Sequence, residues 1–145
     1  MAQRNRSELI GVLERSALFG GLTRKQLNAV AKVCCQQHFA PGEEIVREND
    51  YGHKMVALIS GTARVASKGR TIAKVGAGEA VGEMSLIDGR PRSASVVAES
   101  AVEAIELYRT AFQKLLDEIP AMSTRLLLAQ TARIRELDRH AAALG

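Results

Sequence analysis

Cysteine and aromatic residues are scarce in this sequence, and each shortage excludes a class of protein. The two cysteines, Cys34 and Cys35, are neighbours, so a disulfide between them would be strained and could not join distant elements. With only His38 nearby, they are too few for a zinc site, and we expect two reduced, buried thiols on a helix. Aromatic residues make up 3% of the chain, which leaves little surface for stacking the bases of a single strand.

Long apolar runs are missing as well. No segment approaches the roughly 20 apolar residues that a membrane-spanning helix needs. The opening MAQRNRSEL lacks the apolar core of a secretory signal. We therefore expect a cytoplasmic protein with no membrane partner.

Basic residues are in modest excess, with 20 Lys and Arg against 16 Asp and Glu and a formal charge of +4. They are scattered along the chain and form no basic block. This distribution favours a small anionic ligand over a nucleic acid, so we expect no DNA binding by this chain alone.

The residues that catalysis needs are also not grouped. Ser85 and Ser93 have no histidine nearby in the sequence, and His38, His53 and His140 are typical of surface positions on helices or loops. The glycine pattern from Gly76 to Gly82 lacks the strand–turn–helix context of a dinucleotide-binding fingerprint. We expect neither an enzyme nor a cofactor.

The residue patterns that are present predict one domain over 1–145, with a β-rich middle between helical ends. Residues 7–37 have helical spacing, interrupted at 20–21, and Thr23 with Gln26 predicts a capping box. Residues 38–109 alternate in short segments between glycine turns, which favours a jelly-roll type of antiparallel barrel. Its expected strands are 44–47, 55–60, 62–66, 71–75, 94–98 and 102–107.

Two helices are expected to close the chain over 110–144. Thr110 is a candidate cap for the first, and Pro120 favours the start of the second at 121. Six residues of the second helix fall on the a and d positions of a short heptad seam: Leu127, Gln130, Ile134, Leu137, Ala141 and Leu144. The seam either packs on the domain's own barrel or pairs with a second copy in a homodimer, and the sequence leaves both open.

The most informative stretch is 81–98, V-G-E-M-S-L-I-D-G-R-P-R-S-A-S-V-V-A. Arg92 offers a guanidinium fork to two oxygens of a phosphate, and Pro91 fixes the backbone before it. Glu83 repels phosphate but accepts a hydrogen bond from a sugar hydroxyl, and Gly82 allows a ligand close to the backbone. A helical turn over 83–87 would add free N–H groups at Met84 and Ser85. These residues fit a sugar-phosphate site, while a plain Glu83–Arg92 salt bridge fits them equally well.

This stretch resembles the phosphate-binding cassette of the cyclic nucleotide-binding domain family, of the catabolite activator and kinase regulatory-subunit types. Its string G-E-M-S-L-I-D-G-R-P-R-S-A-S-V is similar to the family pattern G-E-x-[AS]-L, followed by P-R-[ST/A]-A. The resemblance extends to L-F-G-G-L-T-R-K-Q-L at 18–27, P-G-E-E-I-V at 41–46 and L-I-S-G-T-A-R-V at 58–65. Val81 departs from the phenylalanine that is common there.

The resemblance implies an eight-stranded β-roll with N-terminal helices and C-terminal lid helices, and a cassette over 81–95. It implies that Glu83 binds the ribose 2′-hydroxyl and Arg92 the cyclic phosphate. The phosphate would be lined by Gly82, Met84, Ser85, Ser93 and Ala94.

The family's last helix folds over the base, and alignment with bacterial members places Arg133 near the ligand. Leu137 and Asp138 fall where those members have base-contacting hydroxyls, so the base identity stays open. For a sequence of bacterial character we expect cAMP, with cGMP as the alternative. The expected role is a sensor that moves its last helix for a still unknown effector protein. The alternative is a degenerate fold that binds nothing and serves as a dimerisation or interaction scaffold.

Overall fold

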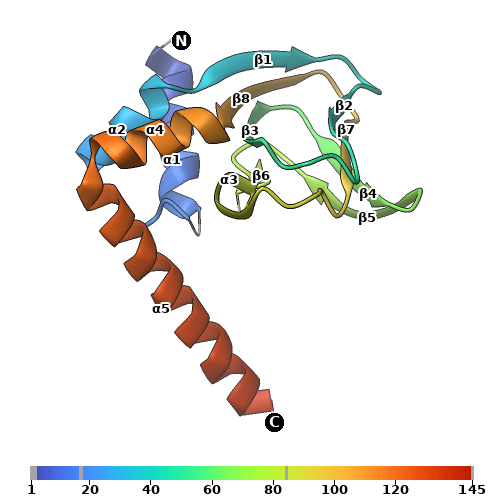
Figure 1. The fold of residues 1–145 in the computed structure, drawn as a ribbon. Helices are drawn as coiled ribbons and strands as arrows, with labels where there is room; N and C mark the ends of the chain where they lie inside the picture. Colours follow the sequence, from blue (N-terminus) through green and yellow to red (C-terminus); the bar gives the residue numbers. More distant parts are fainter. Residues whose placement is uncertain (1–2, 17, 84, 145) are drawn as a thin grey trace.

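The computed structural model describes residues 3–16, 18–83 and 85–144, with the side chains of 3–5, 133, 137 and 142–144 left aside. In this part of the chain, eight strands form two four-stranded antiparallel sheets, ordered β1-β8-β3-β6 and β2-β7-β4-β5. The strands are β1 (Cys35–Phe39), β2 (Glu44–Val46), β3 (Lys54–Ser60), β4 (Ala63–Ser67), β5 (Arg70–Val75), β6 (Ala80–Val81), β7 (Ser95–Ala98) and β8 (Val102–Tyr108). The predicted β-roll is confirmed, with the helices gathered on one side of it (Figure 1).

Strand β3 separates two hydrophobic clusters, because its side chains alternate between the two faces of its sheet. Met55 and Ala57 pack among the helices, whereas Val56 and Leu58 pack inside the roll. Strand β8 alternates in the same way, and both strands are therefore apolar along most of their length. This double burial explains the uninterrupted apolar run that marks β3 in the sequence.

The N-terminal helices are shorter than the sequence pattern predicts. Helix α1 spans Gln3–Arg15 and α2 spans Arg24–Lys32, and the predicted Thr23–Gln26 capping box is present at the start of α2. The helical prediction to residue 37 is wrong, because Cys35–Phe39 pairs as edge strand β1 with β8. The two cysteines are therefore not on a helix; Cys34 is half-buried and Cys35 exposed. His38 is exposed on the same strand.

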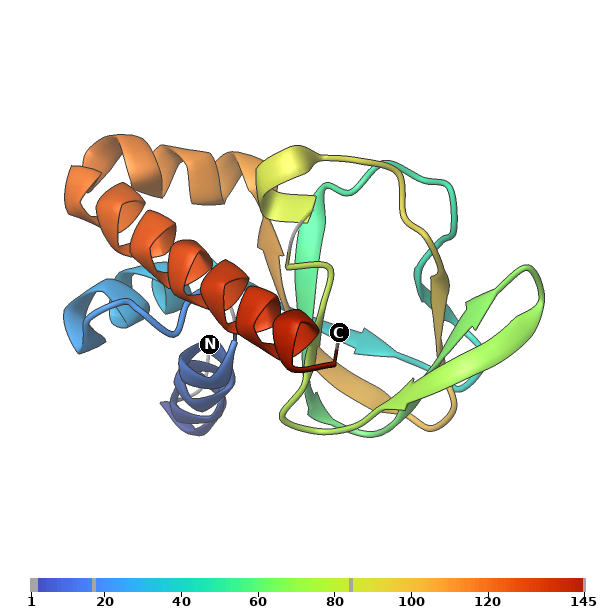
Figure 2. The ribbon, with the colours of Figure 1, turned by 90° about the horizontal axis from the view of Figure 1, so that it is seen from below.

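Two helices follow the roll, α4 (Arg109–Glu118) and α5 (Pro120–Leu144). Pro120 starts α5 as predicted, but the cap predicted at Thr110 is wrong, since α4 begins one residue before it, after the extended Tyr108. Met122 and Leu126 anchor the first turns of α5 in the helical core. The rest of α5 runs away from α4 below the junction of the helices and the roll, and its C-terminal part projects beyond the rest of the molecule (Figures 1 and 2).

The side chains of Leu137 and Leu144 lie outside the described residues, and the rest of the predicted seam of α5 lies largely in solvent. Leu127 and Ile134 are 67% and 57% exposed, and Gln130 is half-buried. Packing of the seam on the roll and pairing with a second copy both stay predictions. Among the helices of the described residues, none is long and apolar enough to cross a membrane.

Candidate ligand-binding site

A cavity of about 900 Å³ opens where the cassette stretch, the roll and α5 meet. This volume lies within the range of small-molecule sites, about 300–1,000 Å³. The roll contributes its apolar wall, made of Val46, Val65, Val81 and Val96. Six of the predicted ligand-binding residues line it: Gly82, Glu83, Ser85, Arg92, Ser93 and Ala94. Met84 lies outside the described residues, and so does the side chain of Arg133.

Backbone hydrogen bonds fix Arg92 to the β2–β3 loop. Its N–H donates to the carbonyl of Asp50 at 2.7 Å, and its carbonyl accepts from the N–H of Asn49 at 2.8 Å. Tyr51 and Pro91 form an isolated bridge beside this pair. The position of Arg92 is therefore set by main-chain pairing with a loop 42 residues earlier, counted from Asp50, as well as by the proline before it.

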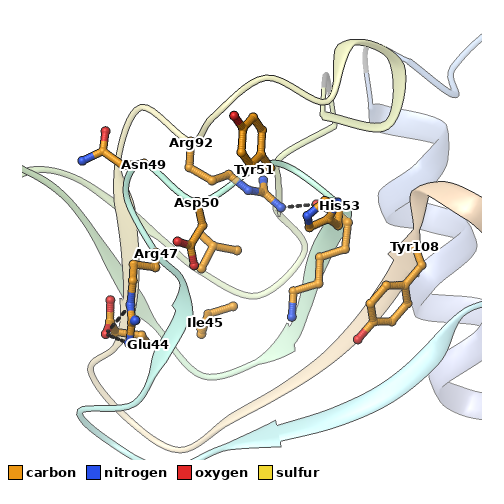
Figure 3. A pocket seen from close by; sticks show the side chains of 11 residues that line it. Glu44, Ile45, Arg47, Asn49, Asp50, Tyr51, His53, Arg92 and Tyr108 are labelled. Carbon is orange, nitrogen blue, oxygen red and sulfur yellow. Dashed lines mark hydrogen bonds and ion pairs between the residues drawn. The ribbon is translucent and has the colours of Figure 1, made fainter.

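The guanidinium of Arg92 has no carboxylate partner among the described residues. It donates through Nη2 to the carbonyl of Lys54, and that bond is dashed in Figure 3. Burial lowers the pKa of Arg92 from its ordinary value, because the charged group loses part of its hydration. An arginine stays protonated in spite of such a shift, so a half-buried positive charge, paired with no carboxylate of the described residues, faces the cavity.

Gly82 provides the space in which this guanidinium lies. Its φ is +79°, a region that glycine enters without strain. A Cβ at this position would collide with Nη1 of Arg92 and approach the carbonyl of Lys54. The position of the Arg92 guanidinium therefore requires a glycine at residue 82.

Glu83 is hydrogen-bonded to Ser16 and Leu18 and not to Arg92, its partner in the salt-bridge alternative. Its Oε2 accepts a 2.5 Å hydrogen bond from the hydroxyl of Ser16 and a 3.3 Å one from the N–H of Leu18. In the described part of the chain, Glu83 and Arg92 are not paired, and the cavity lies beside both. The salt-bridge alternative is therefore not the arrangement of this structure.

The helical turn of the cassette is α3 (Ser85–Asp88), which begins two residues later than predicted. The N–H of Ser85 donates to the carbonyl of Gly82 at 3.1 Å, so the expectation that this N–H is free for an anion is wrong. Ser85 is buried against Gly52, where a Cβ would collide with its side chain. The β2–β3 loop therefore packs against α3 through Gly52 and Ser85, in addition to pairing with Arg92.

Further residues that the sequence did not single out as ligand contacts also line the cavity. They are Arg15 at the end of α1, Asp88 and Arg90 of the cassette, and Gln130 and Ile134 of α5. The spacing of four between Gln130 and Ile134 places them on one face of the helix. The heptad spacing of Gln130 and Ile134 was the sequence signal that could have identified them as lining residues. No local pattern in the sequence marks Arg15.

A second cavity, of about 610 Å³, shares Val46 and Arg92 with the first and extends along the β2–β3 loop (Figure 3). At its edge, Nζ of Lys54 lies 2.5 Å from Oε2 of Glu106, whose side chain is 1% exposed. Tyr108 donates to the same carboxylate at 3.0 Å, and this bond raises the pKa of Tyr108. The described residues contain no cluster of three or more His, Cys, Asp or Glu that could hold a metal ion.

Comparison with known proteins gives a consistent family. The family model of the cyclic nucleotide-binding domain matches residues 36–119. The chain is 33% identical over 128 residues to a cAMP-dependent protein kinase regulatory subunit of Hypocrea atroviridis, covering 87% of this chain and 28% of that protein. It is 27% identical over 137 residues to a cGMP-dependent protein kinase of Plasmodium berghei, covering 94% of this chain and 16% of the kinase.

A solved cyclic nucleotide-binding domain from Methylobacillus flagellatus is 34% identical, with a TM-score of 0.74, and the match covers 94% of this chain and 82% of that one. The chain therefore spans less than a third of the two curated relatives but most of the isolated domain. The family match includes every strand except the first residue of β1, together with the whole cassette. The chain belongs to the cyclic nucleotide-binding domain family.

Proposed function

We propose that this chain is a regulatory domain that binds a cyclic nucleotide, cAMP rather than cGMP, in the 900 Å³ cavity. The observation that carries the proposal is the guanidinium of Arg92, half-buried beside the cavity with no carboxylate partner among the described residues. A cyclic phosphate supplies the counter-charge, and charge-assisted bonds to an anion are stronger than the bond to a neutral carbonyl.

Each end of the ligand has a partner in the proposed site. Arg92 binds the cyclic phosphate, and Glu83 accepts a hydrogen bond from the ribose 2′-hydroxyl. Gly82, Met84, Ser85, Ser93 and Ala94 line the phosphate, and Arg133 lies toward the base. The base lies toward α5, which contributes Gln130 and Ile134 to the cavity wall. No catalytic step, cofactor or DNA contact is part of this proposal.

The ligand acts by changing the position of α5. The phosphate draws the Glu83 turn inward, the segment 115–120 bends, and α5 covers the base. Exposed apolar side chains on α5, at Leu127, Leu128 and Ile134, provide surface that closure removes from water. A ligand shifts such an equilibrium only as far as its affinity differs between the open and closed states. An effector protein in the cytoplasm would sense the closed helix.

Isothermal titration with cAMP and cGMP tests the proposal, repeated with Arg92→Ala. The variant should bind at least about tenfold more weakly, because removing one partner of a buried charge pair costs about 2–5 kcal/mol. Arg24→Ala is the matched control: it removes the same charge from an exposed pair with Glu14 and should bind like wild type. The thermal melts of both ligand-free variants should stay close to that of wild type.

Two results would count against this function. Binding by Arg92→Ala equal to that of wild type would refute the role of the guanidinium. No heat with either nucleotide would favour the alternative of a non-binding scaffold that associates through α5.

A further inference from the structure

Ser16 connects the end of α1 to the acid of the cassette, across 67 residues of sequence. Its side chain is buried, and its hydroxyl donates to Oε2 of Glu83 at 2.5 Å. The same hydroxyl oxygen accepts from the N–H groups of Leu18 and Phe19, at 3.2 and 3.3 Å. The N–H of Leu18 also lies 3.3 Å from Oε2.

These contacts fix the direction of the serine proton. A hydroxyl has one donor and two acceptor positions, and both acceptor positions are filled by backbone N–H groups. The proton therefore points to Glu83, and a hydrogen bond to a carboxylate is roughly twice as strong as a neutral one. The α1–α2 junction thus holds one oxygen of the acid in a fixed place.

The other carboxylate oxygen, Oε1, takes no hydrogen bond from the described residues. Glu83 lines the large cavity together with the cations Arg15 and Arg92. A glutamate free to rotate there would be drawn toward either guanidinium, because opposite charges attract strongly in a partly dry site. Held through Oε2, it presents Oε1 for a ligand and leaves Arg92 for the phosphate.

We infer that Ser16 is a positioning residue that orients Glu83 toward the ribose 2′-hydroxyl and keeps it from pairing with Arg92. The inference rests on the proposed function, since it concerns the same site. It adds a residue outside the cassette on which recognition of the sugar depends, and it ties that recognition to the N-terminal helices.

The test compares cAMP with 2′-deoxy-cAMP, which lacks the hydroxyl in question. We expect wild type to prefer cAMP by about tenfold or more, the effect of one hydrogen bond to a charged group. Ser16→Ala should lower this preference about threefold or more. The affinity for 2′-deoxy-cAMP should fall less than the affinity for cAMP, because only competition of the released Glu83 for Arg92 weakens its binding. Ser16→Thr keeps the hydroxyl and should restore the preference.

A second background shows whether Ser16 acts through Glu83. Glu83→Gln should itself reduce the preference for cAMP, and adding Ser16→Ala to it should reduce the preference no further. Thermal melts of each ligand-free variant report any loss of folding, and Ser16→Thr and Glu83→Gln give the comparison if Ser16→Ala is unstable.

The outcomes separate this inference from the function on which it rests. A wild-type chain that binds neither nucleotide overturns the proposed function. A chain that binds cAMP and 2′-deoxy-cAMP equally has no ribose contact, which overturns the inference and the role assigned to Glu83 but leaves nucleotide binding through Arg92 standing. Unchanged preference in Ser16→Ala, or equal weakening of both nucleotides, also overturns it, because Ser16 would then serve only the packing of α1.

Discussion

Gly82 and Arg92 occupy one small volume, which makes the glycine as sensitive to substitution as the arginine. In Gly82→Ala, the new methyl group would collide with the guanidinium, and the backbone would be strained at φ +79°. We expect nucleotide affinity to fall about tenfold or more and stability to fall by about 1–3 kcal/mol. Titration and urea denaturation measure the two effects.

Gly69 separates collision from backbone strain. Its φ is +77°, close to that of Gly82, but apart from Gly69 and its two chain neighbours no described residue has an atom within 4 Å of where its Cβ would be. Gly69→Ala should therefore lose similar stability while binding like wild type. Equal losses of affinity in the two variants would show that the contact with Arg92 is unimportant.

Cys34 should be a slow nucleophile although it lies near the surface of the chain. Burial, with a smaller effect of Cys35, raises the pKa of Cys34 to about 12. The thiolate is the reactive form, so a raised pKa leaves little of it at pH 8. We expect Cys35→Ser, which keeps only Cys34, to react with iodoacetamide at least about tenfold more slowly than Cys34→Ser at this pH. The rate of Cys35→Ser should rise as the pH approaches the pKa of Cys34. Equal rates for Cys35→Ser and Cys34→Ser at pH 8 would contradict the prediction.

At the scale of elements, strands β3 and β8 are joined by the Lys54–Glu106 pair as well as by their backbone ladder. Lys54→Met would leave the carboxylate of Glu106, 1% exposed, without its positive partner. Because an uncompensated buried charge is strongly unfavourable, we expect a loss of about 3–5 kcal/mol in the free energy of unfolding.

The surface pair Lys74–Glu99 is the control, since Lys74 is 71% exposed and the two groups are 3.5 Å apart. Lys74→Met should change stability by less than about 1 kcal/mol. Glu106→Gln should cost less than Lys54→Met, because the 24% exposed Lys54 side chain can reach water. Urea denaturation of the three variants tests this order, and comparable losses for Lys54→Met and Lys74→Met would contradict it.

At the scale of the whole molecule, ligand binding should appear as thermal stabilisation. A nucleotide at about 100 times its dissociation constant contributes about 2.7 kcal/mol. For a chain of this size, that corresponds to a rise of about 5–10 °C in Tm. Thermal unfolding with and without cAMP measures the rise, and Arg92→Ala at the same cAMP concentration should show little of it. An equal rise in the variant would place the nucleotide elsewhere.

Six of the eight strands of the described residues could be predicted from the residue pattern, because strand alternation and turn glycines are local signals. The eight-stranded roll and the cassette followed from the resemblance to the family. Strand β1 was missed because Cys35 to His38 are all exposed, so no buried face marks this edge strand. Glu106 reads as an ordinary polar position of β8, yet it is buried against Lys54. The contact between Ser16 and Glu83 joins distant segments, and no local pattern could have indicated it.

The placement of β3 has a consequence for how this domain could transmit a signal. Met55 and Ala57 face the helical core, while Val56 and Leu58 face the interior of the roll, so one strand belongs to two separate hydrophobic layers. In the proposed movement of α5, the helices would shift against one face of β3, while the residues on its opposite face would stay packed inside the roll. The proposed motion and the packing of the roll would then depend on different faces of one strand.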